Sequence, residues 1–330
     1  MRLATYNVEW FTNLFDRNDR LCLDDKWSGR RDITRAEQGK ALGHVFRKLD
    51  CDAVMIVEAP DSSRRRKTDR ALTAFAGEFD LRTRAVAIGF VNDTQQEIAL
   101  LYDPDLVSAV HDPRASEAAP QFDTAFKIDL DIDATEDRVE FSKPPLEVAM
   151  QTISGTTLRL IGAHLKSKAP HGATTRDEIM RRSIANRRKQ LAQAIWLRRR
   201  IEDHLTARDP VILLGDLNDG PGLDEYEHLF GRSSVEILMG DDMYDPHARQ
   251  ALRQRVPAMH TSARFLIHPQ NTYLQALLDY MMISPDLMAR RPAWRIWHPF
   301  NDAECWADED LRAALLIASD HFPVTLDIEI

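Results

Sequence analysis

Runs of apolar and alternating residues divide the chain into predicted strands. Residues 2–8 alternate between apolar and polar, which predicts a half-buried β-strand. Short apolar runs at 52–57 and 211–215 are typical of strands buried on both faces. Further strands are expected over 82–88, 97–102, 157–163, 279–283 and 322–328, with two or three more within 122–152.

Helical periodicity is clearest in two segments. Residues 34–49 have Thr34 in the N-cap position and Glu37 in the capping-box position. The longest helix is predicted over 174–206. Its expected apolar stripe consists of Met180, Ile184, Leu191, Ile195 and Leu205. A shorter helix is expected near 68–77, and residues 219–275 are too rich in turn formers to assign.

The order of these elements predicts an α/β fold in which two packed sheets carry helices on the outside. No internal repeat, low-complexity tract or linker interrupts the pattern, so we expect one domain over residues 1–330. A hydrophobic content of 44% allows a sizeable core. No apolar run approaches the roughly 20 residues that span a bilayer, so no membrane partner is expected.

Two further observations favour a cytoplasmic location. The N-terminus reads as a strand and lacks the long apolar region of a signal peptide. The three cysteines, Cys22, Cys51 and Cys305, are odd in number and far apart, which indicates neither a disulfide framework nor a zinc site.

Charge is distributed unevenly along the chain. The net charge is −9, which argues against a protein that coats nucleic acid. Residues 164–200 nevertheless carry eleven Lys and Arg and only two acidic residues, a composition suited to an extended anion. One side of the 174–206 helix would display Arg181, Arg182, Arg188 and Lys189, either as a solvated face or as a track for a polyanion.

Polar residues stand at the ends of several predicted strands. Singly, each is more typical of a turn, a cap or a structural hydrogen bond. Together they supply the acids, imidazoles and neutral donors that phosphoryl transfer requires. These residues are Asn7, Glu58, His164, Asp216, Asn218, Asp279, Asp320 and His321.

In this order, the motifs resemble those of the deoxyribonuclease-like endonuclease/exonuclease/phosphatase superfamily. The matching segments are Ala-Thr-Tyr-Asn-Val-Glu-Trp-Phe (4–11), Met-Ile-Val-Glu-Ala (55–59), Glu-Ile-Ala-Leu-Leu-Tyr (97–102), Ala-His-Leu-Lys-Ser-Lys (163–168), Leu-Gly-Asp-Leu-Asn-Asp-Gly-Pro (214–221), Leu-Asp-Tyr-Met-Met-Ile-Ser (278–284) and Ser-Asp-His-Phe-Pro-Val (319–324). The His-Leu-Lys-Ser-Lys form resembles a bacterial subgroup described as nucleases or phosphohydrolases. The resemblance implies a four-layer α/β sandwich of two packed, mostly antiparallel sheets flanked by helices.

The resemblance also implies roles for individual residues. Glu58 would be the main Mg²⁺ (or Mn²⁺) ligand, with Asn7 beside the metal or the phosphate and Asp320 as a further ligand. Asp216 would activate the attacking water, and Asn218 would donate to a phosphoryl oxygen.

The two histidines would face the reacting phosphate. His321 would stabilise the charge that builds on it, oriented by Asp279, and His164 would contact it.

Lys166 and Lys168 follow His164 at alternate positions, so an extended segment would point all three to one side. The two lysines are expected to bind the substrate phosphate, the alternative being solvated lysines on a loop. Glu9 is expected either to lie near the metal or to contact the residues that bind it. Two departures concern the substrate: residues 261–278 lack the expected aromatic-rich run, and no counterpart to the DNA-contacting Arg and Tyr of deoxyribonuclease is found.

Three other clusters have a structural and a functional interpretation. Strand alternation is favoured over a calcium loop for Asp129, Asp131, Asp133, Asp137 and Glu140, because Ala134 replaces the necessary Gly. A packed cluster is favoured over a base-stacking wall for Trp294, Trp297, Phe300 and Trp306. An exposed polar loop explains Asp241, Asp242, Asp245 and His247 as well as an auxiliary metal site does.

The sequence therefore predicts a divalent-metal-dependent phosphohydrolase, in which an Asp-activated water attacks the phosphate with assistance from the metal. The expected substrate is a phosphodiester, of nucleic acid or a nucleotide. Two alternatives remain at this point: a phosphomonoesterase acting on inositol or sugar phosphates, and a non-catalytic binding module on the same fold.

Overall fold

Two β-sheets form the centre of the molecule. The computed structural model describes residues 1–92, 96–129, 137–170, 172–220, 230–253, 260–267 and 271–330. The first sheet has the strand order β14 (Ala293–Ile296), β15 (Val324–Asp327), β1 (Arg2–Asn7), β2 (Ala53–Ala59), β4 (Glu97–Tyr102) and β3 (Ala85–Ile88). The second has the order β13 (Asp279–Ile283), β10 (Val211–Asp216), β9 (Thr157–His164), β8 (Leu146–Thr152) and β5 (Val107–His111).

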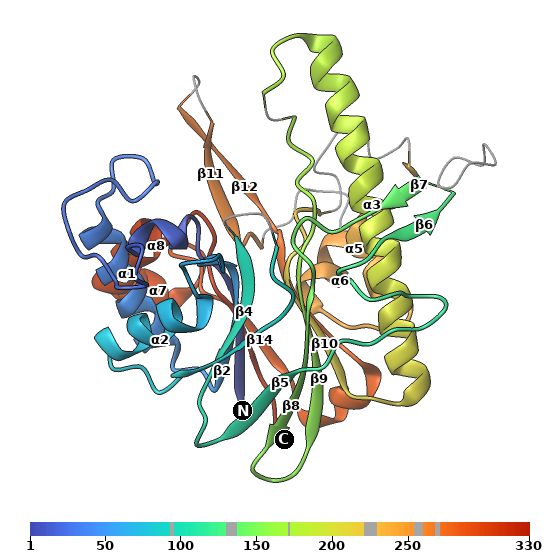
Figure 1. Cartoon of the computed structure of the whole chain (residues 1–330), viewed down its shortest axis with the longest axis horizontal. Coiled ribbons are helices and arrows are strands. Elements are labelled where there is room, and N and C mark those ends of the chain that lie inside the picture. Colours follow the sequence, from blue (N-terminus) through green and yellow to red (C-terminus); the bar gives the residue numbers. More distant parts are fainter. Residues whose placement is uncertain (93–95, 130–136, 171, 221–229, 254–259, 268–270) are drawn as a thin grey trace.

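Helices lie outside both sheets (Figure 1). On the side of the first sheet are α1 (Arg35–Leu49), α2 (Thr68–Glu78), α7 (Ala303–Ala307) and α8 (Glu309–Ala318). The second sheet is flanked by α3 (Arg176–Ala207) and α5 (Ser234–Met239), and α6 (Pro246–Arg253) follows in the chain. Short 3₁₀ turns occupy Phe11–Leu14 and Pro285–Arg290. The predicted four-layer α/β sandwich is thus confirmed.

Only two neighbouring strand pairs in the large sheets are parallel, β1 with β2 and β9 with β10. Each pair is joined through a helix, α1 or α3, as a parallel connection requires. The capping box predicted for α1 is present, with Thr34 and Glu37 each accepting from the other's backbone N–H. The remaining pairs in both sheets are antiparallel, as expected.

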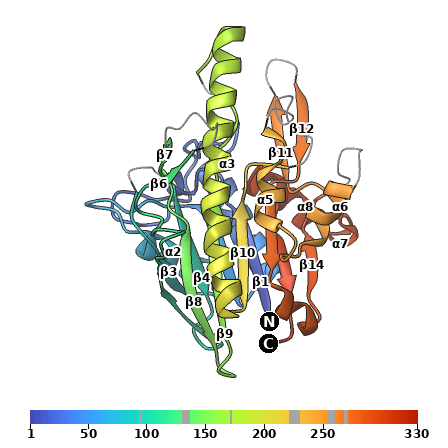
Figure 2. The same ribbon diagram turned by 90° about the vertical axis from the view of Figure 1, so that its right-hand side faces the viewer.

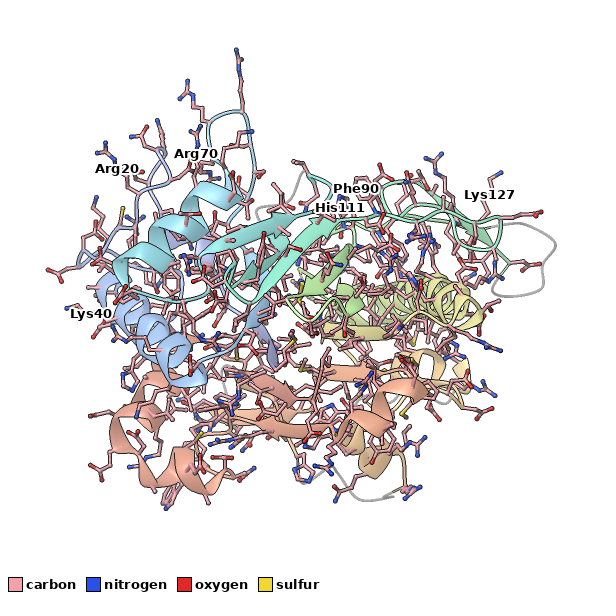
Figure 3. All side chains as sticks on the ribbon, turned by 90° about the horizontal axis from the view of Figure 1, so that it is seen from below. Arg20, Lys40, Arg70, Phe90, His111 and Lys127 are labelled. Carbon is pink, nitrogen blue, oxygen red and sulfur yellow. The ribbon has the colours of Figure 1, made fainter. Side chains whose placement is uncertain are left out.

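The inner faces of the two sheets share one core. Gly162 in β9 lies against Met55 in β2, and a Cβ on this glycine would come within 2.5 Å of the Met55 sulfur. At the outer edge, Phe90 after β3 meets His111 of β5 edge-on, with ring centroids 4.8 Å apart (Figure 3). This close packing makes the relative position of the sheets well defined.

Several elements were not predicted. Residues 107–111 form β5 although only the neighbouring strands were expected, and α7 and α8 fill the segment before the last strand. The unassigned segment contains α5, α6 and the hairpin of β11 (Ala263–Ile267) and β12 (Thr272–Ala276). By contrast, the two or three strands expected within 122–152 are present as β8 and as β6 (Phe126–Ile128) and β7 (Asp137–Val139), which pair with each other. No helix in the described part of the chain is long and apolar enough to cross a membrane.

The long helix α3 corrects one prediction about its apolar stripe. Met180 is exposed rather than buried, and burial begins only near Arg187. The reason is visible in Figures 1 and 2: the N-terminal half of α3 extends beyond the sheets, where no core is available to cover it. The β11–β12 hairpin projects on the same side of the molecule.

Candidate active site

The predicted site residues meet at one edge of the two sheets because of strand register. In the first sheet, Asn7 at the end of β1 pairs with Val57, next to Glu58. In the second, Asp216 at the end of β10 pairs with both His164 of β9 and Asp279 of β13. Carboxyl ends of parallel strands meet at the same sheet edge, which places these side chains together.

Unusual backbone conformations occur at this edge. Glu58 has a φ of 61° and lies in a β-bulge between Val57 and Ala59. Asn218 also has a positive φ, 49°. Non-glycine residues in this region are uncommon and are concentrated at functional sites. A bulge re-aims a side chain that regular alternation would direct elsewhere, and Glu58 lines the cleft described below.

Asp216 is the centre of the site and is almost fully buried. Its Oδ2 accepts from Asn7 Nδ2 (2.9 Å) and Asn218 Nδ2 (3.3 Å), and its Oδ1 accepts from the Asn218 backbone N–H (2.8 Å). The Nε2 atoms of His164 and His321 lie 3.7 and 3.8 Å from Oδ2. Burial raises the pKa of Asp216 to about 7, against the opposing effect of charged His321.

His321 and Asp279 form a buried pair. His321 Nδ1 lies 2.7 Å from Asp279 Oδ2, which also accepts from the Ser262 hydroxyl (2.8 Å). The Ser319 hydroxyl accepts from the His321 backbone N–H (3.1 Å) and so holds the histidine from its other side. Burial alone would lower the pKa of His321, but Asp279 and Asp216 outweigh it and raise the pKa to about 10.

Possible oxygen ligands for a hard cation line the cleft that also contains His321. Glu58 and Asp320 line the same cleft as Asn7. Burial raises the pKa of Glu58, and the positive charges of Lys143 and His321 oppose that rise. Asn7 Oδ1 is buried and has no hydrogen-bond partner among the described residues. An orphaned amide oxygen in a cleft that two carboxylates also line fits a divalent cation with oxygen ligands, such as Mg²⁺ or Mn²⁺.

A second possible metal cluster consists of Asp216, Asp279 and His321, whose ligand atoms lie within 4.8 Å of one another. The hydrogen bond between His321 Nδ1 and Asp279 Oδ2 already uses one atom of each of those residues. The chemistry of this cluster therefore favours an acid–base group, and the oxygen ligands around Glu58 are the better candidate for the metal.

His164 at the end of β9, and Lys166 and Lys168 after it, all line the cleft, as the alternation predicted. Burial lowers the pKa of the half-buried Lys166, with a further contribution from Lys189. Lys168 Nζ lies 2.7 Å from Oδ1 of the fully buried Asp219. The same Asp219 oxygen accepts from Arg187, so Lys168 takes part in a buried ionic cluster. Phosphate binding by the two lysines stays a prediction.

Sequence analysis missed two residues near the candidate catalytic groups. Lys143 precedes β8, and its ammonium lies 3.1 Å from His164 Nδ1. The aromatic ring of Phe265 in β11 meets His321 edge-on, with centroids 5.5 Å apart. A lysine followed by Pro144 and Pro145 within a predicted β region was the available indication for Lys143. Phe265 belongs to a hairpin that no local pattern predicted.

Other candidate residues have structural partners. Glu9 is ion-paired with Arg30. Asp242 pairs with Arg198, and Asp245 accepts from the backbone N–H groups of His247, Ala248 and Met281. Structural contacts therefore explain Asp242 and Asp245, two of the four residues considered for an auxiliary metal site.

Of two further clusters, the aromatic one is packed in part, and the calcium-loop pattern lies partly outside the described residues. Trp297 is buried and the Trp294 indole donates to the Met281 carbonyl, while Phe300 and Trp306 are exposed. None of these four aromatic residues lines the cleft. In the calcium-loop pattern, Asp137 begins strand β7 and pairs with Arg188, whereas Asp131 and Asp133 lie outside the described residues.

The candidate catalytic residues Asp216, Asn218, His164 and His321 line an open cleft of about 1040 Å³. Its walls reach Ile179 in the projecting half of α3 and Leu274 in the β11–β12 hairpin. On α3, Arg181 and Arg182 are exposed, whereas Arg188 is ion-paired with Asp137. A ligand longer than one phosphate ester could extend from the floor between these two projections.

Comparison with known proteins gives a consistent result. The model of the "Endonuclease/Exonuclease/phosphatase family" matches residues 4–321. Truncated TDP2 from Caenorhabditis elegans is 15% identical, with a TM-score of 0.51 over 100% of this chain and 97% of that one. A 3′ phosphatase from Neisseria, NExo, bound to a product DNA hairpin (15%), and an AP endonuclease from Archaeoglobus fulgidus (12%) each have a TM-score of 0.51, with both chains fully covered. No curated protein matches significantly.

Proposed function

Because this chain belongs to the endonuclease/exonuclease/phosphatase family, we propose that it is a divalent-metal-dependent phosphodiesterase acting on nucleic acid or a nucleotide-like ester. Members of the family hydrolyse phosphoester bonds. The observation that carries the proposal is the environment of Asp216, a buried carboxylate held by two amides and faced by two imidazoles.

Asp216 is proposed to orient the attacking water and to accept its proton. A general base is most effective when its pKa lies near the working pH, and burial raises the pKa of Asp216 to about 7. Asn7 and Asn218 hold the carboxylate in place, and Asn218 lines the cleft where its amide can also donate to a phosphoryl oxygen.

His321 is proposed to stabilise the negative charge that develops on the phosphoryl oxygens. Its raised pKa keeps the imidazole protonated at neutral pH, so it presents a fixed positive charge and an Nε2–H donor. Asp279 holds Nδ1 and orients the ring. Lys166 is proposed to bind a substrate phosphate further along the cleft.

The metal is proposed to bind Glu58, Asp320 and the free amide oxygen of Asn7. A bound Mg²⁺ or Mn²⁺ would supply Lewis-acid neutralisation of the phosphoryl oxygens. Three oxygen ligands suit these cations better than softer metals, which prefer sulfur and imidazole.

Two features support an extended anionic substrate. Arg181 and Arg182 are exposed on the half of α3 that borders the cleft. The solved structures named above include a phosphatase bound to a DNA hairpin and an AP endonuclease. The exposed arginines and this similarity are the reasons for proposing nucleic acid as the substrate of this chain.

The test is metal-dependent turnover of a substrate panel by the wild type, Asp216→Asn and His321→Gln. The panel contains plasmid, single-stranded DNA, RNA, bis-p-nitrophenyl phosphate, p-nitrophenyl phosphate, and inositol and sugar phosphates. We expect nucleic acid and the diester to be cleaved with Mg²⁺ or Mn²⁺. Both variants should lose at least about 100-fold in kcat.

The panel also tests the alternatives. Release of inorganic phosphate from monoesters alone would replace the diesterase with a phosphomonoesterase. Absence of turnover and of Mn²⁺ binding, in a folded protein, would support a non-catalytic binding module.

A further inference from the structure

Lys143 enters the floor of the cleft from the turn that precedes β8. The two prolines after it restrict the backbone to extended conformations, which limits where the lysine can point. Lys143 lines the cleft together with Glu58, His164 and Asp216. It therefore joins residues of both sheets at the position where the substrate phosphate is expected.

The contact between Lys143 and His164 defines the protonation state and the tautomer of the histidine. An ammonium can only donate, so His164 Nδ1 accepts from Lys143 Nζ at 3.1 Å. Burial, together with the charges of Lys143 and His321, lowers the pKa of His164 well below its usual value, so the ring is neutral. Its single proton is then on Nε2, which lies 3.7 Å from Asp216 Oδ2.

The charge of Lys143 is not consumed by an ion pair. Burial lowers its pKa, and the carboxylates of Glu58 and Asp216 oppose that decrease from a distance. No carboxylate in the described ranges lies within 4.0 Å of its ammonium, in contrast to Lys168, which is 2.7 Å from Asp219. Lys143 is thus a cation that interacts electrostatically with the proposed metal ligand and the proposed base, and it has donor capacity left for a phosphoryl oxygen.

We propose that Lys143 is a catalytic residue that takes the place of a second divalent cation on the Asp216 side of the site. This inference rests on the proposed function. In two-cation phosphodiesterases, the charges neutralise both sides of the reacting phosphate. Here one metal at Glu58 and the Lys143 ammonium supply the two positive centres, so one metal ion per chain is sufficient.

Substitution of Lys143 distinguishes a purely structural role from the replacement of a metal ion. Removing a structural lysine would disturb His164 and leave metal binding unchanged. Removing a cation that replaces a metal would leave the negative charges of Glu58 and Asp216 without this compensation and would free His164 Nδ1, so that a second Mn²⁺ can bind where the ammonium was.

The test is Mn²⁺ binding to the full chain, measured by electron paramagnetic resonance and calorimetry. Lys143→Met removes the charge, Lys143→Arg retains it, and Lys40→Met is the control on the outside of the molecule (Figure 3). We expect one Mn²⁺ per chain in the wild type, Lys143→Arg and Lys40→Met, and two in Lys143→Met. Turnover by Lys143→Met should fall about 100-fold at low Mn²⁺ and recover at least tenfold at millimolar Mn²⁺.

Equal Mn²⁺ stoichiometry and affinity in the wild type and Lys143→Met would overturn the inference. Two Mn²⁺ ions in the wild type would also overturn it, and that measurement does not depend on any variant folding. Lys143→Gln serves as a second neutral variant if Lys143→Met fails to fold. A wild type that binds no Mn²⁺ and cleaves no phosphate ester would instead contradict the proposed function itself.

Discussion

Two buried ionisable side chains, Asp216 and His321, have pKa values displaced in the same direction for different reasons. The pKa of Asp216 is raised because burial disfavours the charged form of the carboxyl group. The pKa of His321 is raised because Asp279 and Asp216 favour the charged imidazole more strongly than burial disfavours it. Between the two values, the carboxylate is ionised while the imidazole is protonated, which is the state that the proposed reaction needs.

A bell-shaped pH dependence of kcat/KM is therefore expected. The rate should rise with pH as Asp216 loses its proton near 7 and fall as His321 loses its proton near 10. Asp279→Asn should move the alkaline limb to lower pH, because it removes the largest effect that raises the pKa of His321. Initial rates at saturating metal measure both limbs, and an unchanged alkaline limb in Asp279→Asn would contradict the assignment.

At the scale of single elements, β9 and β10 must approach closely for Asp216 and His164 to pair. Gly215 makes this possible, since it has a φ of 140° and a Cβ there would lie 2.0 Å from the Ala163 carbonyl oxygen. Neither the backbone conformation nor the space admits a larger residue.

Gly215→Ala is expected to destabilise the protein by about 3 kcal/mol or more. Urea unfolding measures the change. Gly77→Ala is the matched control, because Gly77 lies in α2 with no atom within 4 Å of its added Cβ. That substitution should be neutral or stabilising by up to about 1 kcal/mol. Similar unfolding midpoints for the two variants would show that the β9–β10 approach is not as tight as described.

The projecting half of α3 is the element that would bind an extended anion. Arg181→Gln together with Arg182→Gln should raise KM for nucleic acid about tenfold at moderate salt. The slope of log KM against log salt concentration should fall by roughly two, because two contacts with phosphates are lost. Turnover of bis-p-nitrophenyl phosphate should not change, because that substrate does not reach the helix. Arg20→Gln with Arg70→Gln removes two exposed arginines elsewhere on the molecule (Figure 3) and should change neither value.

The whole molecule assembles the site from both sheets. Asn7 and Glu58 come from the first sheet, and His164, Asp216 and Asp279 come from the second. Neither sheet by itself carries both the proposed base and the proposed metal ligands, so the site depends on how the sheets pack.

The prediction of one domain over residues 1–330 follows from this shared core and is tested by calorimetry. We expect one cooperative unfolding transition in metal-free buffer, with calorimetric and van't Hoff enthalpies in agreement. Added Mg²⁺ or Mn²⁺ should raise the midpoint, since it binds the folded state. Two separable transitions would indicate two folding units instead.

Local features of the sequence were enough to predict most elements and the chemical character of the site. Apolar periodicity predicted β1, β2, β9, β10 and α1 to within a few residues, because short-range geometry determines which face of a strand or helix is buried. The polar residues after these strands were recognisable because they interrupt buried segments at fixed places in the family order.

Tertiary structure alone decided which side chains became partners. Asn7 donates to Asp216 across 209 residues of chain, and Lys168 meets the buried Asp219, which local periodicity does not encode. Lys143 reaches His164 only because β8 and β9 are neighbouring strands. Met180 is exposed only because the N-terminal half of α3 extends beyond the core. Burial and charge environment depend on what surrounds a residue in space, and sheet packing determines those surroundings.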